Sequence, residues 1–197
     1  MPWITFPRVR VRVSPFVLPA ALFMLALESA LPFAVLILSA LIHESGHLLA
    51  LKKQGARPRR IDVLPMGAVI VCPEGLACKE ELAVALAGPA FSFAAALVCF
   101  FAFLISGGVY PLYACLINAL LAFFNLLPLK KLDGGKALFN LLCIRGTDCA
   151  ENARVCSAAN TCAAALCAVL ALAAFFYSGF NPGAAVLMLS LAMQLFR

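Results

Sequence analysis

The chain has 197 residues, of which 64% are hydrophobic and only 12% are charged, and its mean hydropathy is +1.02. Soluble domains are roughly half apolar, so this composition excludes an ordinary soluble enzyme and predicts a single membrane-embedded domain in a lipid bilayer. The formal charge of +6 comes from short basic clusters between apolar runs, which are typical of membrane topology signals and do not indicate a nucleic-acid partner.

The first apolar stretch, residues 14–51, is too long for one membrane crossing. As a single helix it would measure roughly 55 Å, whereas the hydrocarbon core of a bilayer is about 30 Å thick. A polar, helix-breaking corner at Glu28, Ser29 and Pro32 divides the stretch. We therefore predict two spans here, and the basic residues 52–60 are expected to end the second.

Residues 61–72 (IDVLPMGAVIVC) favour strands over a span. They are apolar and β-branched, too short to cross a bilayer as a helix, and interrupted by Pro65 and Gly67, which predicts a small β-hairpin at the membrane surface. Such a hairpin would offer an edge strand to an extended substrate, with backbone donors at Val69 or Val71. A plain surface anchor is the alternative.

Further apolar segments complete the predicted architecture, and a polar stretch, residues 130–160, interrupts them. Upstream of all spans, valines alternate with arginines from Arg8 to Val13, which indicates either a short strand beside the hairpin or a basic membrane anchor. The fold class is predicted as an all-α polytopic membrane protein with about six transmembrane helices and a small membrane-surface β-hairpin. The predicted spans lie near residues 14–28, 31–51, 82–106, 109–128, 161–178 and 183–197.

The orientation of these spans follows from the basic residues. With the N-terminus in the cytosol and the spans alternating, all 15 Lys and Arg residues fall on the cytoplasmic side of the membrane. The positive-inside rule requires this distribution. It therefore supports both the predicted number of spans and the predicted direction of each.

The segment His43-Glu44-Ser45-Gly46-His47 carries the chemistry. Its two histidines lie one helical turn apart, so both imidazoles can reach one ion. Zinc suits them because it accepts neutral imidazole nitrogens and keeps one position open for water, beside which Glu44 would act as general base. A chance match is the alternative, but ionisable groups inside apolar spans are costly and usually functional. These are the only two histidines in the chain.

A catalytic zinc ion usually takes a third protein ligand, and Asp133 is the best-placed carboxylate. It follows the fourth predicted span, where Pro128 ends the helix and the glycines at 134 and 135 let the backbone turn back toward the site. Because the second and fourth predicted spans end at the same membrane face, we expect Asp133 at the depth of the histidines. The alternatives are an interfacial Asp-Gly turn, or a membrane zinc protease whose third ligand is a helical glutamate, Glu151.

Taken together, four motifs resemble the site-2 protease family of intramembrane metalloproteases, in particular its bacterial branch of stage IV sporulation protein FB. Where the family often has an aromatic residue followed by two glycines, this chain has Met66-Gly67-Ala68. The motifs, which cover roughly residues 8–140, are His43-Glu44-x-Gly46-His47, Leu64-Pro65-Met66-Gly67, Ala87-Gly88-Pro89 and Asn125 to Gly135.

The resemblance implies a cytosol-facing zinc ion held by His43, His47 and Asp133, with Glu44 as base. It also implies a multi-pass protein of the bacterial cell membrane that cleaves a membrane-tethered protein, in regulated proteolysis of a signalling or transcription-factor precursor. A role in sporulation rests on the resemblance alone. Asn125 is implied to position or polarise the substrate, and an interhelical hydrogen bond is the alternative.

A rival from another class is a metal transporter, or a non-proteolytic membrane protein that binds metal. Transport predicts further polar residues along the spans, of which the sequence shows almost none. The sequence identifies neither the substrate nor an inhibitory membrane partner.

Overall fold

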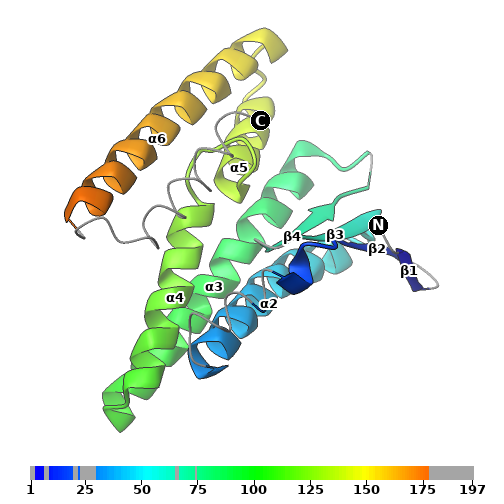
Figure 1. Cartoon of the computed structure of the whole chain (residues 1–197). Coiled ribbons are helices and arrows are strands. Elements are labelled where there is room, and N and C mark those ends of the chain that lie inside the picture. Colours follow the sequence, from blue (N-terminus) through cyan, green and yellow to red (C-terminus); the bar gives the residue numbers. More distant parts are fainter. Residues whose placement is uncertain are drawn as a thin grey trace. The chain divides into compact units, whose positions relative to one another are not determined.

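The computed structural model describes residues 3–6, 9–19, 22, 30–64, 67–73 and 75–177. The chain divides into two compact units, residues 1–125 and 126–197, and each is described by itself. The first unit holds β1 (Trp3–Phe6), β2 (Val9–Val13), α2 (Ala30–Lys53), β3 (Arg60–Leu64), β4 (Gly67–Val71), α3 (Cys78–Ser106) and α4 (Val109–Asn125), and the second holds α5 (Asp133–Ile144) and α6 (Cys149–Tyr177) (Figure 1).

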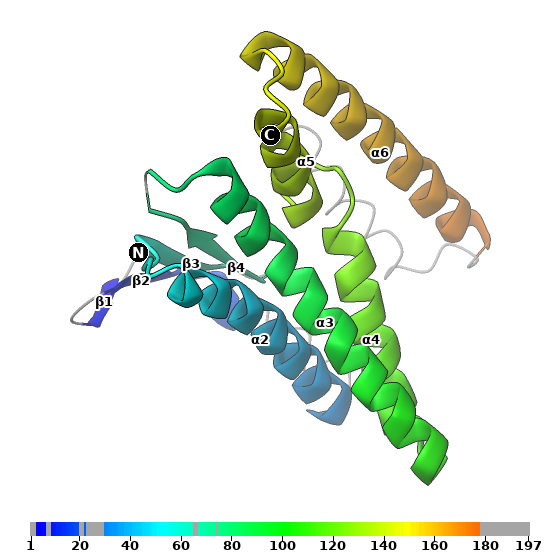
Figure 2. The same ribbon diagram turned by 180° about the vertical axis from the view of Figure 1, so that it is seen from behind.

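Helices α2, α3 and α4 pack against one another in the first unit, as both views show (Figures 1 and 2). Pro32 lies in the first turn of α2, where the missing N–H of proline is tolerated, and Gly55, with a φ of +68°, follows the end of this helix. Gly107 closes α3 with a φ of +62°. The helices predicted over residues 31–51 and 82–106 are thereby confirmed. The helix predicted over 109–128 ends earlier, at Asn125, because Pro128 disfavours helical backbone just before it.

This first unit buries small polar groups and exposes large apolar ones. Ser39, Ser92 and Asn118 are 1%, 0% and 2% exposed, whereas Ile105 is 89% exposed. The Nδ2 atom of Asn118 donates a hydrogen bond to Ser39 Oγ over 2.8 Å, which links α4 to α2. Such a pattern is typical of helices that meet through small residues and hydrogen bonds while their outer surfaces face lipid.

Three helices of the described part are long and apolar enough to cross a membrane, namely Ala30–Lys53, Cys78–Ser106 and Ala150–Leu170. Helix α4 is apolar but shorter, with 17 residues. At 1.5 Å per residue it is about 25 Å long. The prediction of six spans is thus supported in part. The predicted span 14–28 lies mostly, and the predicted span 183–197 wholly, outside the described residues.

The predicted hairpin is confirmed as β3 and β4, but it belongs to a four-stranded sheet with the order β1-β2-β3-β4. Of the two interpretations of residues 8–13, a strand beside the hairpin is the one found, since β2 pairs with β3 in parallel. Parallel neighbours need a crossover connection, and α2 lies in the segment that joins them. The helix that carries the histidines therefore belongs to the connection between two paired strands of the sheet. Strand β1, which pairs antiparallel with β2, was not predicted, and the description as all-α is corrected accordingly.

Backbone hydrogen bonds fix which residues of β4 face its partner. Ser14 N donates to Val63 O over 2.9 Å, so the backbone polar groups of Val63 point toward β2. Because this direction alternates along a strand, the backbone polar groups of Asp62 point toward β4. Those of its register partner, Val69, point back toward β3. The 2.9 Å bond from Arg59 N to Val71 O agrees.

The N–H groups of β4 that point away from β3 are therefore those of Ala68 and Ile70. Among the described residues β4 is the last strand of the sheet, so these two groups lie along a free edge. The assignment of the edge donors to Val69 or Val71 was wrong. A one-residue shift along a strand reverses the direction of every backbone group, and the sequence pattern alone does not determine which parity applies.

In the second unit, α5 and α6 pack against each other around Leu129, Ala163 and Ala164. Residues 130–160, predicted as a polar stretch between spans without a secondary structure, contain α5 and the start of α6. Gly134 and Gly135 do not form a turn but lie in the first turn of α5. A Cβ atom on Gly134 would lie 2.1 Å from Leu126 O, so the glycine lets the preceding loop run against the helix.

Candidate metal centre

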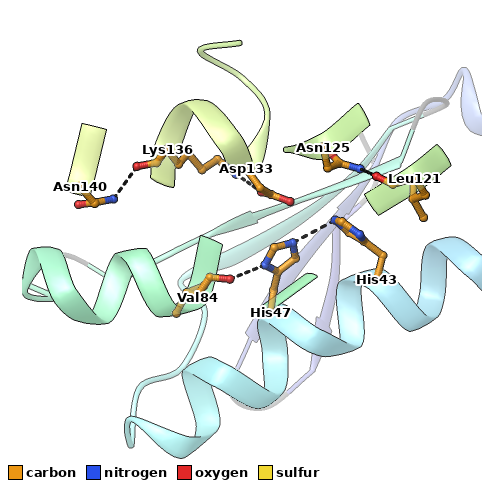
Figure 3. A network of polar contacts seen from close by, with 8 residues as sticks. All are labelled: His43, His47, Val84, Leu121, Asn125, Asp133, Lys136 and Asn140. Atoms are coloured by element: carbon orange, nitrogen blue, oxygen red, sulfur yellow. Dashed lines mark hydrogen bonds and ion pairs between the residues drawn. The ribbon is translucent and has the colours of Figure 1, made fainter. Parts of the chain in front are cut away.

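Helix α2 brings His43 and His47 together on its buried face. Their side chains are 4% and 7% exposed, and their Nε2 atoms lie 3.3 Å apart (Figure 3). The ring centroids are 5.0 Å apart with an interplanar angle of 75°. Because i and i+4 positions share one side of a helix, two histidines at this spacing direct their outer ring nitrogens to one point.

The other ring nitrogens are both anchored to α3. His47 Nδ1 lies 2.7 Å from the carbonyl oxygen of Val84, and His43 Nδ1 lies 2.9 Å from Ser92 Oγ. A carbonyl oxygen only accepts hydrogen bonds, so His47 carries its proton on Nδ1, and Nε2 of the neutral ring has a bare lone pair. Second partners of this kind orient the ring of a metal-binding histidine.

The separation of the two Nε2 atoms fits a shared metal ion. Two bare lone pairs that face each other repel unless a proton or a cation lies between them. In a tetrahedral zinc site with Zn–N bonds of about 2.0–2.1 Å, two nitrogen ligands are about 3.4 Å apart. The 3.3 Å between His43 Nε2 and His47 Nε2 agrees with this value. The residue types and their spacing thus fit zinc.

Gly88 keeps open the space beside these nitrogens. A Cβ atom on Gly88 would lie 2.2 Å from His47 Nε2 and 2.8 Å from His43 Nε2. Gly46 allows the same close approach from α2, because a Cβ atom added to it would lie 2.5 Å from the carbonyl oxygen of Ala87. Two glycines therefore allow α2 and α3 to approach closely where the imidazoles meet, as small residues do between membrane helices.

The remaining predicted residues of the first unit lie on α2 and α4. Glu44 follows His43 directly and is partly exposed. Asn125 is the last residue of α4, and its Nδ2 atom donates to Leu121 O over 2.9 Å, a bond within its own helix (Figure 3). An asparagine of α4 does make a hydrogen bond to another helix, but it is Asn118, which lies two turns before Asn125.

The two carboxylates considered as third ligand belong to the second unit. Asp133 is buried at the first position of α5, and its Oδ1 atom lies 3.1 Å from Lys136 Nζ. Glu151 is exposed in the first turn of α6. An exposed carboxylate in a solvated first turn is an ordinary helix-stabilising feature.

Comparison with known proteins decides the family. Residues 32–114 and 108–172, which include both histidines and Asp133, match the model of Peptidase family M50. The chain belongs to peptidase family M50. This confirms the resemblance to site-2 proteases, whose members are membrane proteins and zinc metalloproteases.

Individual relatives of this M50 peptidase agree. It is 36% identical over 120 residues to a zinc metalloprotease of Methanocaldococcus jannaschii, which covers 57% of this chain and 34% of that protein. It is 33% identical over 139 residues to stage IV sporulation protein FB of Bacillus subtilis, covering 68% of this chain and 48% of that protein. The chain thus spans about a third and about half of the lengths of these two relatives.

A solved structure shows the same fold. The site-2 protease from Methanocaldococcus jannaschii matches with a TM-score of 0.65 and 23% sequence identity, over 98% of this chain and 90% of the other. At this identity the likeness speaks for the fold of the M50 peptidase alone.

The contacts of α3 with the histidines were not predicted from the sequence. Gly88 was named only as part of the Ala87-Gly88-Pro89 motif, and Val84 and Ser92 were not considered. The signal that would have found them is their spacing, since residues 84, 88 and 92 lie on successive turns of one helix face. These three residues have the same i, i+4 spacing as His43 and His47, so one face of α3 can contact both imidazoles.

Proposed function

We propose that this M50 peptidase is an intramembrane zinc metalloprotease that hydrolyses a peptide bond of a membrane-tethered protein, within or at the cytoplasmic edge of the bilayer. The observation that carries the proposal is the buried pair of imidazoles, whose Nε2 atoms are 3.3 Å apart and whose Nδ1 atoms are both held by α3. Family membership and the apolar helices support it.

In this proposal His43, His47 and Asp133 hold the zinc ion. When bound, zinc would supply Lewis-acid polarisation of a carbonyl group and would acidify water. Glu44 takes a proton from the attacking water as general base and passes it to the leaving amine. Its position directly after His43 on α2 supports this role. Asn125, at the end of α4, is proposed to position the substrate.

Asp133 is preferred to Glu151 as the third ligand. The Asp133 side chain is buried, whereas Glu151 is exposed, and a buried carboxylate is stable when it faces a cation. The alternative type of membrane zinc protease, with a helical glutamate as third ligand, therefore has less support. Metal analysis of the Asp133→Ala and Glu151→Ala variants separates the two.

We further propose that the protein lies in a bacterial cell membrane with its zinc site toward the cytosol. The last turn of α2 carries Lys52 and Lys53, both exposed, and Arg57 and Arg59 follow in the exposed loop. Basic residues at one end of a span favour the cytoplasmic side. Regulated proteolysis of a signalling or transcription-factor precursor, and control by an inhibitory membrane partner, are the roles proposed by analogy with the sporulation relative.

The test of the proposed function is co-expression with a library of tagged single-span proteins. The native chain should shorten at least one of them, and a Glu44→Gln form at equal membrane abundance should not. A non-proteolytic membrane metal-binding protein would leave every tagged protein intact in both cases. Identical fragments from both forms would mean that Glu44 has no part in the reaction.

A substrate helix must be locally extended before it is cut, because its carbonyls are otherwise engaged in its own hydrogen bonds. We propose that the extended segment pairs with the free edge of β4, through the N–H groups of Ala68 and Ile70. Strand addition of this kind supplies main-chain hydrogen bonds at an exposed sheet edge. The α2 helix contacts β4, so a segment bound there lies beside the helix that carries the histidines.

Proline at Ile70 removes one edge donor and leaves the pairing of β4 with β3 intact. We expect cleavage to slow by about 2- to 10-fold, the value of one net hydrogen bond, with zinc retained. Ile70→Ala is the matched control, since it removes the side chain but keeps the donor. Cleavage rates are measured on one tagged substrate in membranes. A native rate for folded, zinc-loaded Ile70→Pro would favour the surface-anchor interpretation.

A further inference from the structure

Ser92 stands out among the side chains that the proposed mechanism does not use. It is 0% exposed, it lies inside the apolar helix α3, and its Oγ atom is 2.9 Å from His43 Nδ1. The two imidazoles differ in the group that contacts Nδ1. His47 Nδ1 is held by the backbone carbonyl of Val84, which any residue at that position supplies, whereas the contact of His43 Nδ1 is with a replaceable side chain.

The tautomer of His43 that binds a metal ion requires a hydrogen-bond acceptor beside Nδ1. A neutral imidazole carries one proton, so a lone pair on Nε2 for the metal requires the proton on Nδ1. This Nδ1–H group is buried, and a buried donor without an acceptor is destabilising. Ser92 Oγ lies 2.9 Å from this nitrogen and can accept its hydrogen bond.

Without metal, a second tautomer of the His43 ring is possible. Its proton can sit on Nε2 and donate to the bare Nε2 of His47, which is 3.3 Å away. The serine hydroxyl satisfies both states, because it accepts from Nδ1–H in the first and donates to bare Nδ1 in the second. An alanine at position 92 makes neither bond, and only in the metal-competent state does the change remove an acceptor from a buried N–H group.

We propose that Ser92 is a positioning residue that stabilises the metal-competent tautomer of His43 by accepting the hydrogen bond from Nδ1. This inference rests on the proposed function, since it assumes a metal ion at the two Nε2 atoms. Its consequence is specific. Loss of the hydroxyl lowers the affinity for zinc and leaves the metal-free protein nearly as stable as before, because the metal-free protein shifts to the other tautomer.

The experiment compares the purified native protein with the Ser92→Ala, Ser106→Ala and His43→Ala forms. Zinc affinity is measured by competition with a chelator, and the unfolding temperature is measured with and without zinc. Ser106 is the matched control because it lies on the same helix, is exposed, and bonds its own helix at Ala102 O. We expect Ser92→Ala to bind zinc about 10- to 100-fold more weakly, as is typical when an outer partner of a metal ligand is lost, and Ser106→Ala to match the native protein.

A second measurement reports the tautomer directly. The chain has only two histidines, so labelling histidine with nitrogen-15 gives signals from two rings alone. In zinc-free Ser92→Ala, we expect the proton of one ring to be on Nε2, and zinc should return it to Nδ1. A residue that only fills space between helices would change the unfolding temperature with and without zinc equally, and it would leave the tautomer unchanged.

Two failures are distinguishable. If His43→Ala loses zinc while Ser92→Ala keeps native affinity, or if Ser92→Ala lowers both unfolding temperatures equally, the inference about Ser92 is wrong and the zinc centre stands. If His43→Ala itself keeps native zinc affinity, the proposed centre is wrong, and the role of Ser92 is rejected with it.

Discussion

Replacing His43 or His47 by alanine is expected to reduce the zinc content from about one ion per chain to nearly none. Each change removes one of three protein ligands from a tetrahedral site, and an incomplete site of two ligands holds zinc weakly. The chain has no third histidine to substitute for the lost one. The measurement is metal analysis of purified protein after removal of free zinc.

The same measurement on Asp133→Ala and Glu151→Ala identifies the third ligand. We expect Asp133→Ala to lose zinc and Glu151→Ala to keep it. Loss of Asp133 also removes the 3.1 Å contact with Lys136, so Lys136→Ala serves as a control for that ion pair. Zinc and activity retained by Asp133→Ala, together with loss of both by Glu151→Ala, would reverse the assignment.

Glu44→Gln is expected to slow cleavage by about 10²- to 10⁴-fold while zinc stays bound. The amide keeps the size of the side chain but cannot accept the proton of the attacking water, and general base catalysis is typically worth that factor. Because no ligand is lost, the zinc content should equal that of the native protein. Rates are measured on a tagged substrate identified by co-expression.

The control for Glu44→Gln is the same change at Glu81, which lies in the first turn of α3 and also loses one negative charge. Native cleavage is expected from Glu81→Gln. Undiminished proteolysis by Glu44→Gln would exclude Glu44 as the base, whatever its zinc content. Equal losses in the two variants would point to charge in general and not to a proton transfer at position 44.

The sequence was most informative where a local rule decides the structure. The spacing of His43 and His47 determines their common face on any helix, so the two imidazoles could be placed without coordinates. Proline at position 32 likewise marked the start of a helix correctly, because its backbone preference is intrinsic.

The sequence was least informative where distant segments decide the structure. The short strand β1 is paired with β2, but its composition resembles that of any amphipathic N-terminus. Helix α5 has two glycines in its first turn, which disfavour helix locally, and the close loop backbone that requires them there is not visible in the sequence. Ser92 was overlooked because the spacing of residues 84, 88 and 92 becomes meaningful only beside the partner of the serine, which lies 49 residues away in the sequence.

The most direct test of the account is removal and restoration of zinc in the native protein reconstituted in lipid vesicles with a cleavable tagged substrate. The chelator-stripped protein should cut nothing, and about one equivalent of zinc per chain should restore cleavage, because the reaction needs a metal ion at the imidazoles. Cleavage at the native rate by fully stripped protein would contradict the proposal that His43 and His47 hold a catalytic zinc ion.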